Sequence, residues 1–425
     1  MPSSSSVWRD RDYLRYWAGH TVSQVGSQVT ELALPLVALL QLGASSTAVG
    51  VLRAVEFVPY LLLTLPVGVL ADRRRRRPLM IAADLGRAAL LALVPLAVLL
   101  DVLSLPLLAG IALAAGALTV VFDVSYMSVL PGLVERDRIQ QANAGLEASR
   151  AAASIAGPGL GGALVSALRA SGAMIVDAVS FVVSALCLLW IRRPEPEPEP
   201  AVGPRGLPAL LVGWRQVTRS PLLLPNTLYM AASNLCGSAF GPVLIVFEVR
   251  ELGLDGLTIG TVAMLGNLGF LAGTMVTRRL GVRIGIGPVI CLASVIAAVG
   301  MAIAASAPRS APVPVLTGGL IVVGLGIALF NLQSMSLRQA ITPAGLLGRV
   351  NAVARLIGWG TVPVGAALGG WLGGAIGLRP VLALTAAGSL LATAIPLFSA
   401  VRHVKQTPEP EPSWTDSRTL DPTAG

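Results

Sequence analysis

Residues 68–101 read GVLADRRRRRPLMIAADLGRAALLALVPLAVLLD, in which five consecutive arginines precede a long apolar run with few charges. An apolar run of about 20 residues is what a helix needs to cross the hydrocarbon core of a bilayer. The whole chain has a matching composition, because 54% of its 425 residues are hydrophobic and only 12% are charged. This composition excludes a soluble enzyme and predicts an all-α integral membrane protein, since helices satisfy their own backbone hydrogen bonds in lipid.

Apolar runs between polar breaks predict twelve transmembrane helices. In the first half these lie near 14–41, 47–70, 79–101, 105–129, 139–167 and 172–191. In the second half they lie near 222–249, 257–280, 285–307, 312–337, 346–375 and 378–401. The predicted domains are an N-terminal six-helix bundle (1–191), a cytoplasmic linker with a short interfacial helix (192–220), a C-terminal six-helix bundle (221–403) and a disordered cytoplasmic tail (404–425).

The basic residues predict the orientation of the chain. If both termini are cytoplasmic, 23 of the 31 Lys and Arg residues lie in cytoplasmic segments and four lie in external loops. Cytoplasmic loops of membrane proteins carry this excess, so we expect a multi-pass protein of the cell membrane with both termini inside. The basic residues lie mostly in short loops between apolar runs. The net charge of +9 therefore does not indicate a nucleic-acid partner. We expect the protein to be a monomer surrounded by membrane lipids.

The two halves of the chain resemble each other in sequence. A shift of 208 positions aligns Asn143-Ala144 with Asn351-Ala352, and Leu160-Gly161-Gly162 with Leu368-Gly369-Gly370, without a gap. Chance matches among common residues are the alternative, but several matches in one register favour a duplication. Two pseudo-repeated bundles place a transport site at the repeat interface.

The arginine-rich loop contains Gly68, Asp72, Arg73, Arg76 and Arg77 at fixed spacing. This pattern resembles the loop signature of the major facilitator superfamily, although Arg75 stands where that signature has a glycine. The resemblance implies the major facilitator fold and a role for this loop as a cytoplasmic latch between the halves. Alternatively, the arginines simply enforce the positive-inside topology, which leaves the single aspartate unexplained.

A second motif lies in the predicted fifth span, where Gly157, Pro158, Gly161 and Gly162 occur together. It is similar to the end of the superfamily's antiporter signature. Small residues allow helices to approach closely, and proline bends a helix. Generic helix packing is the alternative reading.

Further phrases, such as Phe122-Asp123-Val-Ser-Tyr126, resemble the branch of bacterial multidrug, macrolide and siderophore exporters. The resemblance implies a secondary active transporter that exports a small hydrophobic or amphipathic compound by alternating access. Proton-coupled antiport is expected, although the arginine and glutamine pattern of many proton antiporters is absent from the fourth span. An importer of a small metabolite, or a membrane sensor on the same fold that does not transport, are the alternatives.

Ionisable groups inside a membrane are costly, so they are candidates for function. Glu31 lies inside the first predicted span with no basic residue one turn away, and Arg53 and Glu56 lie near the middle of the second. An unpaired and desolvated carboxylate is suited to binding and releasing a proton. We therefore expect Glu31, Arg53 and Glu56 to line the cavity, with either acid as the proton-coupling group.

Two other groups of charges lie toward the predicted cytoplasmic side. Asp84, Arg87 and Asp123 are expected to belong to the latch network near Asp72. The remaining charges, Glu147, Arg150 and Arg355, are the candidates for a cytoplasmic gate, because the repeat places Glu147 and Arg355 at equivalent positions of opposite charge. Local pairing of Glu147 with Arg150 is the alternative.

The second half contains few polar residues within its spans. Asn234 and Asn331 could donate hydrogen bonds to a substrate or to a neighbouring helix. The chain has two histidines and no nucleotide-binding glycine loop with lysine. We therefore expect no catalytic residue, cofactor or metal, and as partners a small-molecule substrate and protons.

Overall fold

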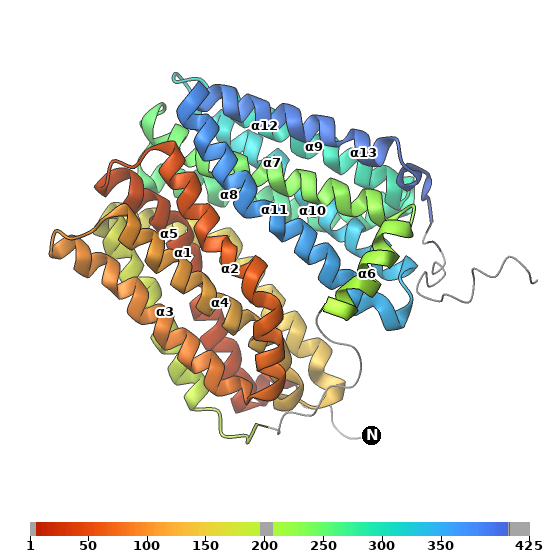
Figure 1. Cartoon of the computed structure of the whole chain (residues 1–425), viewed down its shortest axis with the longest axis horizontal. Coiled ribbons are helices and arrows are strands. Elements are labelled where there is room, and N and C mark those ends of the chain that lie inside the picture. Colours follow the sequence, from red (N-terminus) through yellow and green to blue (C-terminus); the bar gives the residue numbers. More distant parts are fainter. Residues whose placement is uncertain (1–5, 196–206, 407, 409–425) are drawn as a thin grey trace, which may run out of the picture. The chain divides into compact units, whose positions relative to one another are not determined.

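The computed structural model describes residues 6–195, 207–406 and 408, and its regular elements are helices (Figure 1). In the first half the long helices are α1 (Arg11–Gln41), α2 (Ser46–Arg73), α3 (Arg76–Leu99), α4 (Leu105–Leu133) and α5 (Ile139–Leu189). After the short α6 (Leu207–Arg219) come α7 (Leu223–Arg250), α8 (Gly256–Ile284), α9 (Ile286–Ala305), α10 (Pro312–Ile341), α11 (Leu347–Ile376), α12 (Leu378–Ala392) and α13 (Ala394–Leu397). The expected spacer at 194–200 and the tail from 404 fall largely outside the described residues.

Ten of these helices are long and apolar enough to cross a membrane in the described part of the chain. One of the ten, α5, is broken at Arg169, whose φ of 63° and ψ of 165° are not helical. This break separates the predicted fifth and sixth spans, and α1 is the further 31-residue helix at the position of the first. The all-helical architecture with ten to twelve spans confirms the predicted fold class.

Three helices of the first half begin where a polar side chain caps them. The side chains of Asp10, Ser45 and Ser104 accept hydrogen bonds from backbone N–H groups in the first turns of α1, α2 and α4. Such caps satisfy N–H groups that have no partner within the helix. Long apolar sequence therefore forms the helices, and short polar residues fix their starts.

The chain divides into two compact units. The first combines α1–α5 with Pro242–Leu265 and Ala367–Leu378, and the second contains the remaining described parts of the second half with α6. In the first unit α1 packs on α5, α2 on α4, and α3 on both α4 and α5. Its apolar core includes Val37, Leu91, Phe181 and Ile259.

Two segments from the second half of the sequence belong to this first unit, and they form hydrogen bonds with residues of the first half. Ser46 donates a hydrogen bond from Oγ to the carbonyl of Gly370 at 3.1 Å. Arg250 donates to the carbonyl of Ala44 at 2.6 Å. These contacts gather at the end of the unit that the positive-inside rule predicts to be external.

In the second unit the short helix α6 packs on α11. Val217 of α6 is fully buried in the apolar core of this unit, and a Cβ on Gly213 would lie 2.4 Å from the carbonyl oxygen of Arg349. Leu211 and Trp214, by contrast, are exposed. The position of α6 at a membrane surface stays a prediction, and these two exposed side chains are the ones that would enter it.

Candidate functional site

Three charged side chains from α1 and α2 form one cluster, which we call the acidic triad (Glu31, Arg53 and Glu56). The guanidinium of Arg53 donates to Glu31 at 2.6 Å and to Glu56 at 2.9 Å. Gln28 donates from its side-chain amide to the other oxygen of Glu31 at 3.2 Å. The expectation that Glu31 is unpaired is therefore wrong, because its partner comes from the neighbouring helix rather than from its own.

The acidic triad is accessible rather than desolvated. The side chain of Glu31 is 50% exposed, and those of Arg53 and Glu56 are 28% and 27% exposed. All three lie well inside long helices of a membrane protein, where charged groups face a water-filled path rather than lipid. With two carboxylates and one guanidinium in their usual ionised forms, the cluster has a net charge of −1, which a single proton or monovalent cation would neutralise.

An aromatic and acidic stripe continues from the triad along α2. The guanidinium of Arg53 lies 4.7 Å from the ring centroid of Phe57, and that ring stacks on Tyr60 at 5.6 Å. Tyr60 donates its hydroxyl proton to Asp123 of α4 at 2.9 Å. The glycine at 116 permits this approach of α4 to α2, because a Cβ there would lie 2.4 Å from the carbonyl oxygen of Glu56. The stripe offers both flat apolar faces and negative charge to a ligand.

Asp84 and Arg87 of α3 form an ion pair in the interior of the first unit. Asp84 is 0% exposed and Arg87 is 4% exposed. The guanidinium of Arg87 lies over the rings of Phe122 and Phe181, at 4.5 and 4.0 Å from their centroids. The aromatic rings enclose this pair in the packed interior, and its expected part in the latch network stays a prediction.

The arginine-rich loop joins α2 to α3. Gly68 has open space at its Cβ position, and Arg73 is exposed. The side chain of Asp72 lies outside the described residues. Glu195 accepts hydrogen bonds from the backbone N–H groups of Arg76 and Arg77 and so caps α3, which has no side-chain cap of its own. A carboxylate is favoured there by the positive end of the helix dipole.

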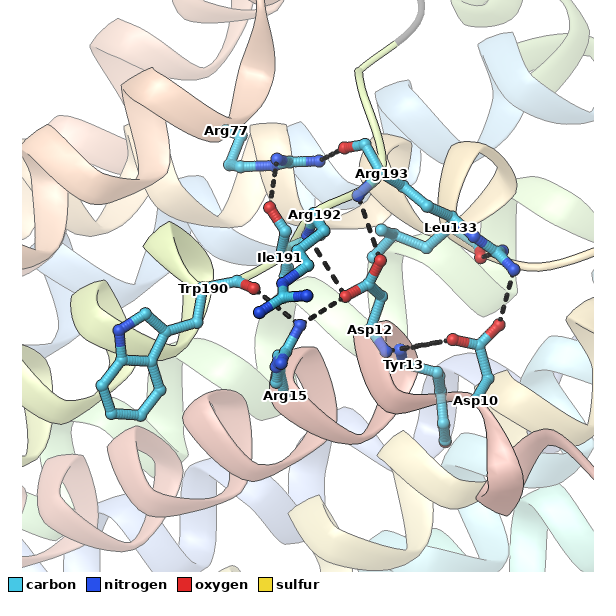
Figure 2. A network of polar contacts seen from close by, with 10 residues as sticks. All are labelled: Asp10, Asp12, Tyr13, Arg15, Arg77, Leu133, Trp190, Ile191, Arg192 and Arg193. Atoms are coloured by element: carbon cyan, nitrogen blue, oxygen red, sulfur yellow. Dashed lines mark hydrogen bonds and ion pairs between the residues drawn. The ribbon is translucent and has the colours of Figure 1, made fainter.

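A polar network holds the segment that follows α5, and we call it the linker clasp (Asp10, Asp12, Arg77, Arg193 and Glu195). Figure 2 shows all of it except Glu195. The carboxylate of Asp12 accepts from the backbone N–H groups of residues 192 and 193 at 3.2 and 3.0 Å. Arg193 forms an ion pair with Asp10 at 3.0 Å, and Arg77 donates to the carbonyl of Arg193 at 2.6 Å. One arginine expected in the latch is therefore bound to the linker.

Asp12 lies before the first predicted span, and its titration is altered by the linker clasp. Burial alone would raise the pKa of Asp12, but the N–H groups of Arg192 and Arg193 and the nearby Arg15 guanidinium outweigh it. The pKa is held below its ordinary value of 3.8. A carboxylate with a lowered pKa stabilises the folded state above its unfolded pKa, and this contribution is lost as the pH falls through the folded pKa.

The glycines of the antiporter-like motif face two different helices. A Cβ on Gly157 would lie 2.3 Å from Cβ of Gln28, and one on Gly161 would lie 3.3 Å from Cα of Val29, both on α1. Gly162 faces α8, where a Cβ would lie 2.9 Å from Cα of Gly260. Pro158 lies between these contacts. The motif thus lets α5 approach α1 on one side and the start of α8 on the other.

The candidate gate residues pair locally in the first half. Arg150 donates to Glu147 at 3.1 Å from Nε, and both side chains are largely exposed. Arg355 lies in the second unit, where it is exposed. The local contact is the one that the alternative interpretation expects.

The two asparagines proposed for substrate binding differ in their surroundings. Asn234 donates from its amide to the carbonyl of Gly358 at 2.9 Å, so it joins α7 to α11 within the second unit. Asn331 is exposed on α10. The amide of Asn331 is the freer of the two to contact a ligand.

Two buried acids were not among the predicted site residues. Asp177, in the second part of α5, and Glu248, near the end of α7, are 1% and 2% exposed. The signal that could have found them is the same one that identified Glu31, namely an acid inside a predicted span.

Comparison with known proteins identifies the family. The family model described as "Major Facilitator Superfamily" matches residues 16–360 and 228–422 of this chain. The chain is 22% identical over 392 residues to the uncharacterised MFS-type transporter YvqJ of Bacillus subtilis, covering 90% of each chain. It is 27% identical to the multidrug efflux pump Tap of Mycolicibacterium fortuitum, covering 88% of this chain and 92% of Tap. Macrolide efflux protein A of Streptococcus pyogenes is 24% identical over 52% of this chain and 56% of its own length.

Solved structures share the fold. A bacterial homologue of the iron transporter ferroportin, in an inward-facing state, matches with a TM-score of 0.76 at 19% identity, over 93% of this chain and 99% of that one. A bacterial homologue of the lysosomal transporter Spinster matches with a TM-score of 0.73 at 13% identity, over 93% and 97%. The chain therefore belongs to the major facilitator superfamily and is a multi-pass secondary transporter of a small molecule, not an enzyme.

Proposed function

We propose that this transporter exports a small hydrophobic or amphipathic compound by alternating access in exchange for protons, and that the acidic triad couples the two movements. The observation that carries the proposal is Arg53 held between Glu31 and Glu56 at 2.6 and 2.9 Å. Binding one proton neutralises the net charge of the triad, and releasing it restores a site that attracts a cation or another proton.

The geometry suits a proton that competes with a compound. Glu31 is half-exposed and bound to Arg53, whose guanidinium also lies over the ring of Phe57, so a bound amphipathic molecule could contact both the acid and the ring. A positively charged head group on such a molecule would favour the ionised triad. Exchange would follow, because the site holds either the compound or the proton at one time.

The direction of transport is proposed from the efflux functions in the names of the two relatives and from the glycine motif of α5. We also propose that both termini are cytoplasmic, which puts the linker clasp and the arginine-rich loop inside the cell. In this arrangement Asp72, Arg73 and Arg76 remain the candidates for the latch, while Arg77 holds the linker.

The test uses purified protein in liposomes that contain a pH-sensitive dye. A gradient of ethidium, a lipophilic cation, should drive proton movement in the opposite direction. In Glu31→Gln or Glu56→Gln this movement should fall at least tenfold. The matched control is Glu135→Gln, an exposed acid paired at 3.0 Å with Arg138 three residues along its chain, which should behave as the wild type. Ethidium-driven proton flux that is unchanged in both triad variants would contradict the coupling role.

Direction is tested in cells. Deletion of the gene should raise the accumulation of ethidium or of a macrolide, because an exporter that is absent leaves its compound inside. Lower accumulation after deletion would instead indicate an importer.

A further inference from the structure

Asp177 is buried where the second part of α5 crosses α1. Its side chain is 1% exposed. A Cβ on Gly26 of α1 would lie 2.4 Å from Oδ1 of Asp177 and 2.2 Å from Oγ of Ser180. The carboxyl therefore lies directly against the backbone of α1, and glycine at position 26 is what permits this contact.

The charges that surround Asp177 do not balance it. The helix α5 packs on α3 and α1. From α3 it faces Arg87 and Asp84, which are already paired with each other, and from α1 it faces the uncharged Gly26 and Thr30. Asp177 has no ion pair of its own among the described residues. An isolated carboxylate in such a site costs far more than a neutral acid, so the group is expected to take up a proton.

Ser180 lies beside this carboxyl but has one hydroxyl proton for two acceptors. Its Oγ donates to the carbonyl oxygen of Asp177 at 2.8 Å and to Oδ1 at 2.9 Å. Serine in a helix commonly donates to a carbonyl of the preceding turn, and a proton shared between two acceptors gives each of them a weaker bond. Ser180 therefore compensates a buried carboxylate only in part.

We propose that Asp177 is a proton-binding site of the first unit, occupied at neutral pH when α1 and α5 are packed as in this structure. The site is separate from the acidic triad and does not depend on which compound is transported. The buried hydroxyl of Thr30 lies beside the same carboxyl and is a donor for its ionised form. Release of the proton leaves a negative charge against α1, so proton binding favours close packing of α1 on α5.

Infrared spectroscopy on purified protein in lipid vesicles tests this directly. Protein labelled with ¹³C at the side-chain carboxyl of aspartate separates aspartate signals from those of buried glutamates such as Glu248. We expect the carbonyl stretch of a protonated aspartic acid at neutral pH in the wild type. It should be lost in Asp177→Asn and kept in Asp101→Asn, an exposed loop acid that serves as the matched control.

A second variant keeps the test decisive if Asp177→Asn does not fold. Ser180→Ala retains the carboxyl but removes its hydrogen-bond partner, so the same band should move to higher frequency. Absence of the band in the wild type, its persistence in Asp177→Asn, or an unchanged frequency in Ser180→Ala would each overturn the proposal.

Discussion

Two acid–arginine pairs with the same spacing have opposite surroundings. Arg53 and Glu56 of α2 lie three residues apart and are more than a quarter exposed, while Asp84 and Arg87 of α3 lie three residues apart and are almost fully buried. The buried pair is enclosed by Phe122 and Phe181, whereas the accessible pair gains a second acid, Glu31, from another helix. This difference predicts that losing one partner of the buried pair costs stability, whereas the accessible pair, with its additional acid, is the candidate for binding a proton.

The largest expected effect on stability comes from removing the arginine of the buried pair. Arg87→Leu leaves the carboxylate of Asp84 buried without a counter-ion, which should lower the free energy of unfolding by about 3–5 kcal/mol. The measurement is denaturation of the purified protein in detergent. Arg53→Leu is the matched change in the accessible pair and should cost less than about 1 kcal/mol. The double variant Asp84→Leu with Arg87→Leu should recover most of the stability. If it does not, the loss in Arg87→Leu is not due to an unpaired buried carboxylate.

The accessible pair should matter for transport instead. Arg53→Gln leaves Glu31 and Glu56 without their shared cation and changes the net charge of the triad by one unit, so the ethidium-driven proton flux should fall at least tenfold. The same liposome assay measures this, with Arg138→Gln as a control that also loses an arginine from an ion pair. A flux equal to that of the wild type would show that net charge at the triad is not what couples transport.

The linker clasp offers an intermediate case, because Asp12 is partly buried and lies outside the spans. Asp12→Asn should cost about 1–2 kcal/mol, since hydrogen bonds to a charged acceptor are lost. Trypsin should then cut several times faster after Arg192, as followed by mass spectrometry. In the wild type, deuterium exchange of the backbone N–H groups of Arg192 and Arg193, corrected for its intrinsic pH dependence, should accelerate only as the pH falls below 3.8, because the lowered pKa of Asp12 keeps it ionised above that value. Equal cutting in both proteins would contradict this role, and Asp137→Asn is the control.

The smallest effect is expected at the exposed pair of Glu147 and Arg150. Exchanging the two charges, with Glu147→Arg and Arg150→Glu together, should change stability by less than about 0.5 kcal/mol. Transport should be retained if local pairing is all that these residues do. If it is instead lost, and Glu147→Arg with Arg355→Glu restores it, the gate hypothesis gains support over local pairing.

Much of the helix map follows from sequence, because the requirement to bury backbone polar groups in lipid leaves little choice. The predicted span near 105–129 is α4 at Leu105–Leu133, and that near 312–337 is α10 at Pro312–Ile341. The boundary between the fifth and sixth spans is a single residue, Arg169, instead of a loop. Hydropathy reports where a run ends only to within a few residues, so it does not resolve so short a break.

The sequence does not show which side chains pair with one another between different helices. Glu31 has no basic residue one turn away, yet Arg53 lies 2.6 Å from it, because the pairing depends on how α1 and α2 meet. Spacing likewise does not show that Asp84 is enclosed in the core, or that Asp123 accepts a hydrogen bond from Tyr60 of another helix. Spacing along one helix gives a face, whereas burial depends on what packs against that face.

The sequence by itself determined that this protein is a helical membrane transporter. The length of the apolar runs, the placement of the arginines and the loop signature are each contained in a short stretch of the chain, so they can be recognised without knowing the tertiary structure. Only the tertiary structure decided which acids are accessible, which are paired, and that Asp177 is buried against Gly26. The physical reason is that the cost of a charge depends on the dielectric and the counter-charges around it, and these are supplied by residues distant in sequence.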